Sequence, residues 1–122
     1  MKKGLNKMCL LGNVGQDPEI RPLPSGGNVA SLTVATGDYW KDKETQEPRE
    51  KTEWHRVVVF GALADLVAKR VQKGTQLYIE AESRTRSFKA QDGVTDVYRQ
   101  EFVIEGYGDV LQVIGGAKPK EQ

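Results

Sequence analysis

Residues Thr52–Gly74 read TEWHRVVVFGALADLVAKRVQKG, and their hydrophobic pattern changes from one period to another near Gly61. Before that glycine, three consecutive valines follow an alternation of aromatic and charged side chains, which predicts a strand whose successive side chains point to opposite faces. After it, apolar residues recur at helical spacing as far as Val71, and Gly74 comes where helices usually end. The stretch therefore predicts a strand followed directly by a helix.

The rest of the chain reads mainly as short strands separated by turns. Two proline-containing turns fall at residues 16–19 and 21–28, and another turn is expected at residues 91–93. Residues 37–51 are rich in charge and poor in apolar side chains, which predicts a long exposed hairpin arm. Besides Thr52–Phe60, the predicted strands are Leu5–Asn13, Asn28–Thr36, Gln76–Phe88 and Val94–Glu105, and a short apolar piece follows at Val110–Ile114.

The predicted order is three strands, one helix and two strands, without internal repeats. Five short strands with a helix between the third and the fourth is the order of an OB-fold, an all-β, five-stranded Greek-key barrel that binds oligonucleotides and oligosaccharides. An SH3-like barrel is the alternative, although it does not need a full helix at this point. At 122 residues we expect one domain, with the barrel at residues 1–116 and a flexible tail at residues 117–122.

The composition argues against several classes of function. The formal net charge is +1, so only local clusters of charge can predict an anionic partner. The single cysteine cannot form an intramolecular disulfide, and no apolar run approaches the ~20 residues of a membrane-spanning helix. Without an adequate signal sequence, we expect a cytoplasmic protein. One His and one Cys are too few for a zinc site, and no phosphate-binding glycine loop is present. We therefore expect no enzyme, no metal and no cofactor.

The two faces of the strand at residues 52–60 differ in chemistry. Alternation places Trp54, Arg56 and Phe60 on one face, and His55 with two valines on the other. The valine face is typical of a core or a subunit contact. The aromatic and basic face is typical of single-stranded nucleic-acid binding, in which flat rings stack on bases and cations follow phosphates. For Phe60, beside the helix entrance, packing and binding are equally good interpretations.

A second strand repeats this combination. The outer half of Gln76–Phe88 places Arg84, Arg86 and Phe88 on one face, and Lys89 follows. Trp40 lies where the second strand enters the charged arm, and its neighbours offer nothing apolar to bury it. Surface arginines taken singly are solvated charges, but their alternation with aromatics favours binding. For three other aromatics a place in the core is the favoured interpretation: Tyr78, Phe102 and, less firmly, Tyr98.

Three segments resemble the bacterial-type single-stranded DNA-binding protein family: GNVGQDPEIRPLPSGGNVASLTVAT, TEWHRVVVFGALAD and KGTQLYIEAESRTRSFK. They match in order and at the family's spacing, and the resemblance runs from about Gly4 to Gly116. It implies an OB-fold that forms homotetramers and wraps single-stranded DNA, without sequence preference, in replication, recombination and repair.

The resemblance also implies roles for residues of this sequence. The expected base-stacking residues are Trp40, Trp54, Phe60 and Phe88. The expected phosphate contacts combine basic residues near the N-terminus with those of the two strands noted above: Lys2, Lys3, Lys7, Arg56, Arg84, Arg86 and Lys89. Because a chain with 38% hydrophobic residues can spare few of them for solvent, the apolar strand Met8–Leu11 is a further candidate for subunit contacts. The expected interface residues are His55, Met8 and Leu10.

Two departures from the family pattern bear on function. Family members commonly have Trp where this chain has Phe88, so stacking there should persist but weaken. They also end in a long linker with an acidic tip that recruits partner proteins, whereas this sequence stops at AKPKEQ. The chain is thus either the core of a longer protein or a tail-less member. Replication and repair proteins are expected as partners only if an acidic tail follows Gln122.

Two other classes of function fit the sequence less well. A protein-interaction OB module of the primosomal type would lack the aromatic and basic face, which is present here. An oligosaccharide-binding enzyme domain would require a pair of carboxylates in a cleft and no basic stripe. Single-stranded DNA binding is therefore the function that the sequence predicts.

Overall fold

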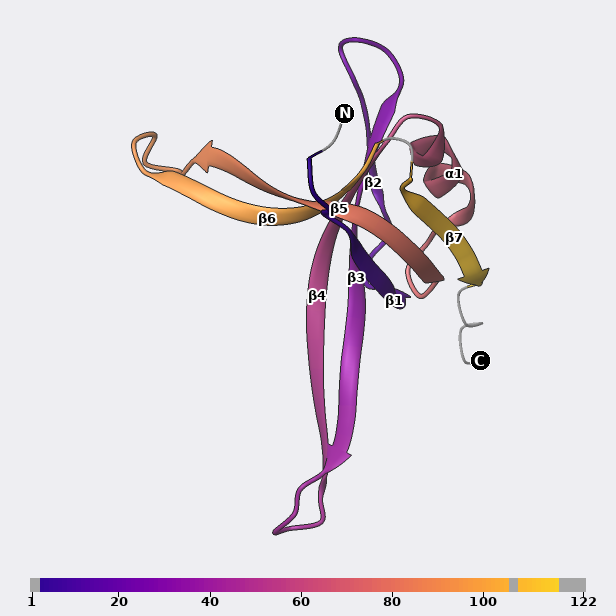
Figure 1. The fold of residues 1–122 in the computed structure, drawn as a ribbon, viewed down its shortest axis with the longest axis vertical. Coiled ribbons are helices and arrows are strands. Elements are labelled where there is room, and N and C mark those ends of the chain that lie inside the picture. The colour runs from indigo at the N-terminus through magenta and orange to yellow at the C-terminus, as the bar shows by residue number, and fades with distance from the viewer. Residues whose placement is uncertain (1–2, 106–107, 117–122) are drawn as a thin grey trace.

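The computed structural model describes residues 3–105 and 108–116. Lys2 and the expected tail at residues 117–122 lie outside the described residues. In chain order the elements are β1 (Met8–Val14), β2 (Glu19–Pro22), β3 (Asn28–Lys41), β4 (Pro48–Phe60), α1 (Ala62–Arg70), β5 (Gln76–Lys89), β6 (Asp96–Ile104) and β7 (Val110–Gly115). Figure 1 shows a barrel from which two long hairpins project in different directions.

Five of these strands pair in a closed ring. β1 pairs with β3, β3 with β4, β4 with β6, β6 with β5, and β5 returns to β1. Every pairing is antiparallel except that of β4 with β6, which joins Val57–Val59 to Phe102–Ile104 in parallel. A five-stranded Greek-key ring with one helix after the third of its strands is the predicted OB-fold, and the prediction is confirmed.

Two short strands were not predicted. β2 pairs with the edge of β3, where turns were expected, and β7 pairs with β5. β2 has a proline before it and another at its end, and proline is tolerated on edge strands because no ladder hydrogen bond is lost there. The short apolar piece expected at residues 110–114 forms β7.

The helix forms at the predicted place and ends earlier than its apolar stripe. Gly61 has φ 76°, in the left-handed region that favours glycine, and there the chain turns from β4 into α1. The helix ends at Arg70, and Val71 is extended yet buried. Ala64 and Val67 are the helical residues that the core buries completely. The helix thus contributes its buried face to the barrel core.

The core consists of the inward side chains of the barrel strands together with this face of α1. Leu10 belongs to it: it is only 8% exposed, whereas its neighbour Leu11 is 57% exposed. Because successive side chains of a strand alternate, β1 can present only one of the two to solvent. Leu10 was expected at a subunit contact; it lies in the core instead, and Leu11 takes the exposed position. The largest fully buried side chains include Val34, Val57, Val59, Val67, Leu77, Ile79 and Ile104.

Both hairpins continue strands of the barrel into solvent (Figure 1). The β3–β4 arm is the predicted charged arm. Its strands pair without interruption from Val29 opposite Phe60 to Lys41 opposite Pro48, so β3 and β4 extend further than predicted. At the tip, the Asp42 carboxylate accepts hydrogen bonds from the N–H groups of Glu44 and Thr45, which lowers the pKa of Asp42. β5 and β6 form the second arm, from Glu82 opposite Val103 to Lys89 opposite Asp96.

Candidate nucleic-acid interface

The two aromatic and basic stripes predicted from sequence form one continuous surface, called here the outer face. On β4 it begins with Trp54, Arg56 and Phe60, which point away from the buried Val57 and Val59. β6 lies between β4 and β5 and pairs with both strands, so the outer face continues from β4 over β6 to β5. Its outward residues Val97, Arg99 and Glu101 lie directly opposite Phe88, Arg86 and Arg84 of β5. The outer face therefore contains all three predicted stacking residues of β4 and β5 and three of the predicted cations.

Trp54 is the most exposed of the predicted stacking residues, at 60%. Its ring lies against the backbone of Gly15, at the end of β1. A Cβ atom built on Gly15 would come within 2.2 Å of the Trp54 ring carbon Cζ3. The close approach is possible only because Gly15 has no side chain, and much of the Trp54 ring stays accessible.

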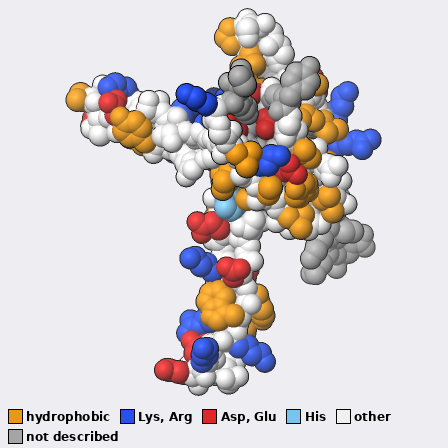
Figure 2. Space-filling model, in the orientation of Figure 1, with side chains coloured by type: hydrophobic (Ala, Val, Ile, Leu, Met, Phe, Trp, Pro, Cys, Tyr) orange, Lys and Arg blue, Asp and Glu red, His pale blue; other side chains and the backbone are white. Residues whose placement is uncertain are grey.

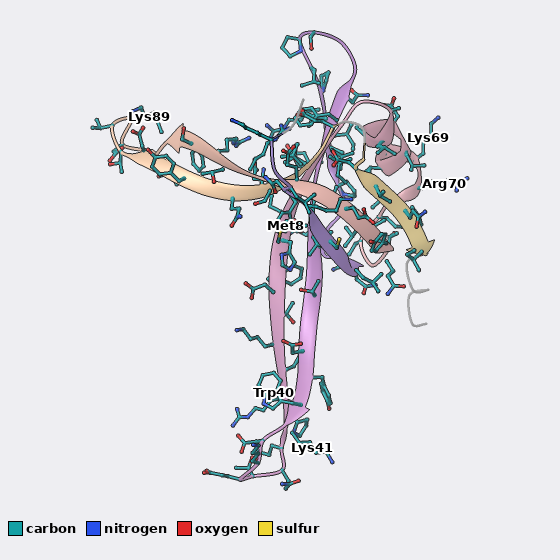
Figure 3. The ribbon with its side chains drawn as sticks, in the orientation of Figure 1. Met8, Trp40, Lys41, Lys69, Arg70 and Lys89 are labelled. Atoms are coloured by element: carbon teal, nitrogen blue, oxygen red, sulfur yellow. The ribbon has the colours of Figure 1, made fainter. Side chains whose placement is uncertain are left out.

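Phe88 lies near the end of the β5–β6 arm and is half-buried. The guanidinium carbons of Arg86 and Arg99 lie 5.8 Å and 5.2 Å from the centroid of its ring, within the range of cation–π contacts. Lys89 follows at the tip of β5, where its Nζ lies 2.7 Å from an Asp96 oxygen (Figure 3). One flat ring and several cations thus occupy a short length of this arm.

Trp40 does not lie on the outer face. In the β3–β4 register Ala35 is opposite Trp54, so the odd-numbered residues of β3 share the face of Trp54 and Trp40 takes the other face, opposite Arg49. It is 46% exposed and lies far along the arm, next to Lys41 (Figure 3). The structure therefore brings Trp54, Phe60 and Phe88 together and separates Trp40 from them.

Most of the predicted phosphate-contacting cations are already paired with carboxylates. Among the described residues, Lys3 alone of the predicted set makes no ion pair with another described residue. The Arg84 guanidinium contacts Glu105 at 2.5 Å and Glu82 at 2.9 Å, and these carboxylates raise its pKa. The remaining pairs are Lys7–Glu80 at 3.1 Å, Arg56–Glu101 at 2.6 Å, Arg86–Glu101 at 3.9 Å and Lys89–Asp96 at 2.7 Å.

Glu101 is the centre of this charge network, and sequence reasoning did not single it out. It is only 4% exposed, and it lies between Arg56 of β4 and Arg86 of β5. The Nε–H group of Arg56 donates a hydrogen bond to it. In the sequence, Glu101 is one of many scattered carboxylates, and its two arginines lie 45 and 15 positions away from it. Only the β4–β6–β5 pairing brings the three together.

Of the aromatics expected in the core, Phe102 packs against the core, and Tyr78 is half-buried with a partner for its hydroxyl. The Tyr78 hydroxyl donates a 2.6 Å hydrogen bond to Glu80. This bond raises the pKa of Tyr78 to about 12, and the same bond, with Lys7, lowers the pKa of Glu80. Tyr98 is 69% exposed on the β5–β6 arm, so its expected place in the core was wrong, because β6 has already left the barrel there.

The remaining interface candidates lie on two different surfaces. His55 is half-buried on the inward side of β4, with its ring centroid 5.6 Å from that of Phe102 and its Nε2 2.9 Å from the Thr36 hydroxyl. Met8 is exposed at the start of β1. β1 pairs with β5 from Met8 to Asn13 but with β3 only at Asn13 and Val14. Among the described residues, one edge of β1 therefore has no strand partner over residues 8–12.

The described residues contain no group of three or more His, Cys, Asp or Glu side chains that could hold a metal ion. No helix in this part of the chain is long and apolar enough to cross a membrane.

Comparison with known proteins agrees with this geometry. The model of the Single-strand binding protein family matches residues 5–110. The chain belongs to this family. Among solved structures, the chain is similar to a protein described as Plasmodium falciparum SSB complex with ssDNA, with 32% sequence identity and a TM-score of 0.79. The match covers 93% of this chain and 98% of that one. Membership places the chain among binding proteins rather than enzymes.

The contact between Trp54 and Gly15 leads to a spectroscopic prediction. In a Trp40→Phe background, Gly15→Ala should displace the Trp54 ring into water and shift its emission to longer wavelength. Because the displaced group is an exposed, rotatable side chain, the unfolding free energy should change by only about 0.5 kcal/mol. Fluorescence and urea denaturation measure the two effects. The control is Gly115→Ala, whose added methyl meets open space. An unchanged emission maximum in Gly15→Ala would contradict the contact.

Proposed function

We propose that this protein binds and protects single-stranded DNA without sequence preference, in replication, recombination and repair, and that the outer face is where the strand lies. The observation that carries the proposal is that Trp54, Phe60 and Phe88 share one sheet surface with Arg56, Arg84 and Arg86. Membership of the Single-strand binding protein family supports it, as does the similarity to an SSB described in complex with ssDNA.

The chemistry of the outer face explains binding without sequence preference. Every base has a π-face, so rings such as Trp54 and Phe88 can stack on any of the four bases, at ~1–3 kcal/mol per base. The cations contact phosphates, which are the same at every nucleotide. A surface that binds through ring faces and phosphates has no means of distinguishing one sequence from another.

The ion pairs determine how the cations engage phosphate. A phosphate that approaches Arg56, Arg84 or Arg86 competes with a fixed carboxylate as well as with mobile counterions. Exposed ion pairs contribute only about 0–1 kcal/mol, so the exchange costs little at Lys7, Arg84 and Lys89. It costs more at Arg56, because Glu101 is buried and would lose its partner. The fixed carboxylates therefore reduce the number of counterions released on binding.

Tryptophan fluorescence tests the proposal directly. The chain has two tryptophans, Trp40 and Trp54, and both are exposed. Adding poly-dT should quench their emission strongly. Trp54→Ala should lose the ~1–3 kcal/mol of binding free energy that one stacked base contributes. This loss should be larger than that in Trp40→Ala or Phe88→Ala, because the Gly15 backbone already orients the Trp54 ring. Emission that stays constant at saturating poly-dT would refute base stacking at these positions.

The Glu101 network leads to a prediction about salt. Glu101→Gln keeps the shape of the side chain and removes its charge, which frees Arg56 and Arg86 to exchange counterions for phosphates. Binding to poly-dT should become tighter at low salt, and the log–log salt slope should steepen by up to about 0.7 for each arginine freed. A salt titration measures both effects, and thermal unfolding checks that the variant is folded.

The matched control for this prediction is Glu44→Gln. It removes the same charge at the tip of the β3–β4 arm, where the Glu44 side chain makes no ion pair with another described residue. Its salt slope should equal that of the parent protein. A parental slope in Glu101→Gln itself would show that this carboxylate does not compete with phosphate.

We infer further that the protein assembles as a homotetramer. The unpaired edge of β1 over residues 8–12 is a template on which a second copy can extend the sheet, and natural proteins rarely leave such an edge open. Met8 and Leu11 are exposed apolar side chains on β1 itself. Ile114 is exposed on β7, which pairs with β5 as β1 does. A second contact through the surface around His55 would join two such dimers.

Sedimentation equilibrium tests the assembly. A tetramer has about four times the chain mass of 13.6 kDa. Leu11→Lys should shift the distribution to smaller species, because it places a charge beside the β1 edge. Leu5→Lys is the matched control: Leu5 is also exposed but precedes β1, so its substitution should leave the mass unchanged. A parent protein that sediments as a monomer at micromolar concentration would overturn the proposal.

A further inference from the structure

Tyr39 is a large exposed aromatic on the β3–β4 arm that is not among the expected stacking residues. It is 73% exposed. The residue across from it is Glu50, which offers the ring no apolar cover. A packing role therefore does not account for a tyrosine at this position. Figure 2 shows hydrophobic side chains on this arm, set among Lys, Arg, Asp and Glu and well away from the barrel.

The strand register places Tyr39 on the same face of the arm as Trp54. Trp54 is opposite Ala35, and Tyr39 is four residues further along β3, so the two rings point the same way. At about 3.3 Å per residue, they lie roughly 13 Å apart along the strand. The outward-facing pair between them is Gly37 and Thr52. No large side chain therefore stands between the two rings on this face.

The charges near Tyr39 favour a bound polyanion on its β3 side, where Lys41 lies, over its β4 side, where Glu50 lies. Lys41 is the next residue of β3 on the same face, opposite Pro48, and it is exposed. It makes no ion pair with any other residue that the structure describes. Lys41 thus differs from Arg56, Arg84 and Arg86, each of which is ion-paired with a carboxylate. Glu50 occupies the β4 side, so the phosphates would run along the β3 side.

We propose that Tyr39 is an additional base-stacking residue, which extends the path of single-stranded DNA from Trp54 along the arm with Lys41 as its phosphate contact. The inference rests on the proposed function and adds a segment to its binding site. Trp40, although adjacent in sequence, lies on the opposite face of the arm. A strand that reaches Tyr39 along the outer face therefore cannot stack on Trp40 as its next ring, and Trp40 engages a different segment of DNA.

The test compares variants on a ladder of dT oligonucleotides from about 4 to about 16 nucleotides, the range that one OB-fold covers. Tyr39→Ala should bind the shortest oligonucleotides as the parent protein does and lose about 5-fold or more in affinity for the longer ones, the equivalent of one stacked base. Tyr39→Phe should retain affinity because it keeps the ring. Tyr39→Leu should behave like Tyr39→Ala, since it keeps apolar volume without a π-face.

Two controls make the result specific. Tyr98→Ala removes an equally exposed tyrosine from the other arm, on the side opposite Phe88, and should leave affinity unchanged at every length. Thermal unfolding of Tyr39→Ala should match the parent protein, because so exposed a ring contributes little to packing. In a second measurement, oligonucleotides substituted with iododeoxyuridine and irradiated should form an adduct that peptide fragmentation assigns to Tyr39 and not to the adjacent Trp40.

The outcomes separate this inference from the proposed function. If the parent protein binds poly-dT and Trp54→Ala weakens that binding, but Tyr39→Ala or Tyr39→Leu binds long oligonucleotides as tightly as the parent, the inference is overturned and the proposed function stands. If the parent protein binds no single-stranded DNA, both are overturned. A length-dependent loss in Tyr39→Ala and Tyr39→Leu, retention in Tyr39→Phe and an adduct at Tyr39 support the inference.

Discussion

The parallel pairing of β4 with β6 is the constraint on which the rest of the structure depends. It consists of only three residue pairs, from Val57 with Phe102 to Val59 with Ile104, yet it closes the ring of five strands. Without it, the hairpins β3–β4 and β5–β6 would be joined only through β1, and the barrel would be an open sheet with its apolar face in water. The pairing buries Val57, Val59 and Ile104 in one core and leaves Arg56 and Arg86 on a common outer face.

The same pairing gives the outer face its balance of charge. Glu101 enters between Arg56 and Arg86 because β6 lies between their strands. A basic surface without such carboxylates would bind any polyanion and would repel a second copy of itself. Here the formal net charge of the chain is +1, and most of the candidate phosphate contacts have a carboxylate within 4 Å. We therefore expect stacking on the exposed rings to contribute more of the binding free energy than the charge–charge attraction, which the ion pairs reduce.

The arms show how a two-residue period organises a binding surface. In the β3–β4 arm, neighbours in sequence such as Tyr39 and Trp40 face opposite ways, while Tyr39 and Trp54, on different strands, face the same way. The uninterrupted pairing from the barrel to Lys41 holds these directions. A ribbon of two strands can therefore present aromatic rings to separate segments of a flexible ligand, which a flat sheet buried on one side cannot do.

Much of this protein follows from its sequence. The alternation in residues 52–60 and the helical period after Gly61 were sufficient to predict a strand followed directly by the helix, because both signals are local. The placing of Trp54, Arg56 and Phe60 on one face followed from the same alternation. The resemblance of three segments to a known family, which the family model confirms over residues 5–110, added the expected function.

Other features were decided only by the tertiary structure. Leu10 rather than Leu11 enters the core, Trp40 leaves the face of Trp54, and Glu101 joins two arginines from different strands. Each of these depends on which strand pairs with which and in what register. A shift of one residue in a register would reverse the face of every side chain on the strand. The sequence pattern therefore determined which side chains travel together on one strand, and only the pairing of strands decided which of them meet.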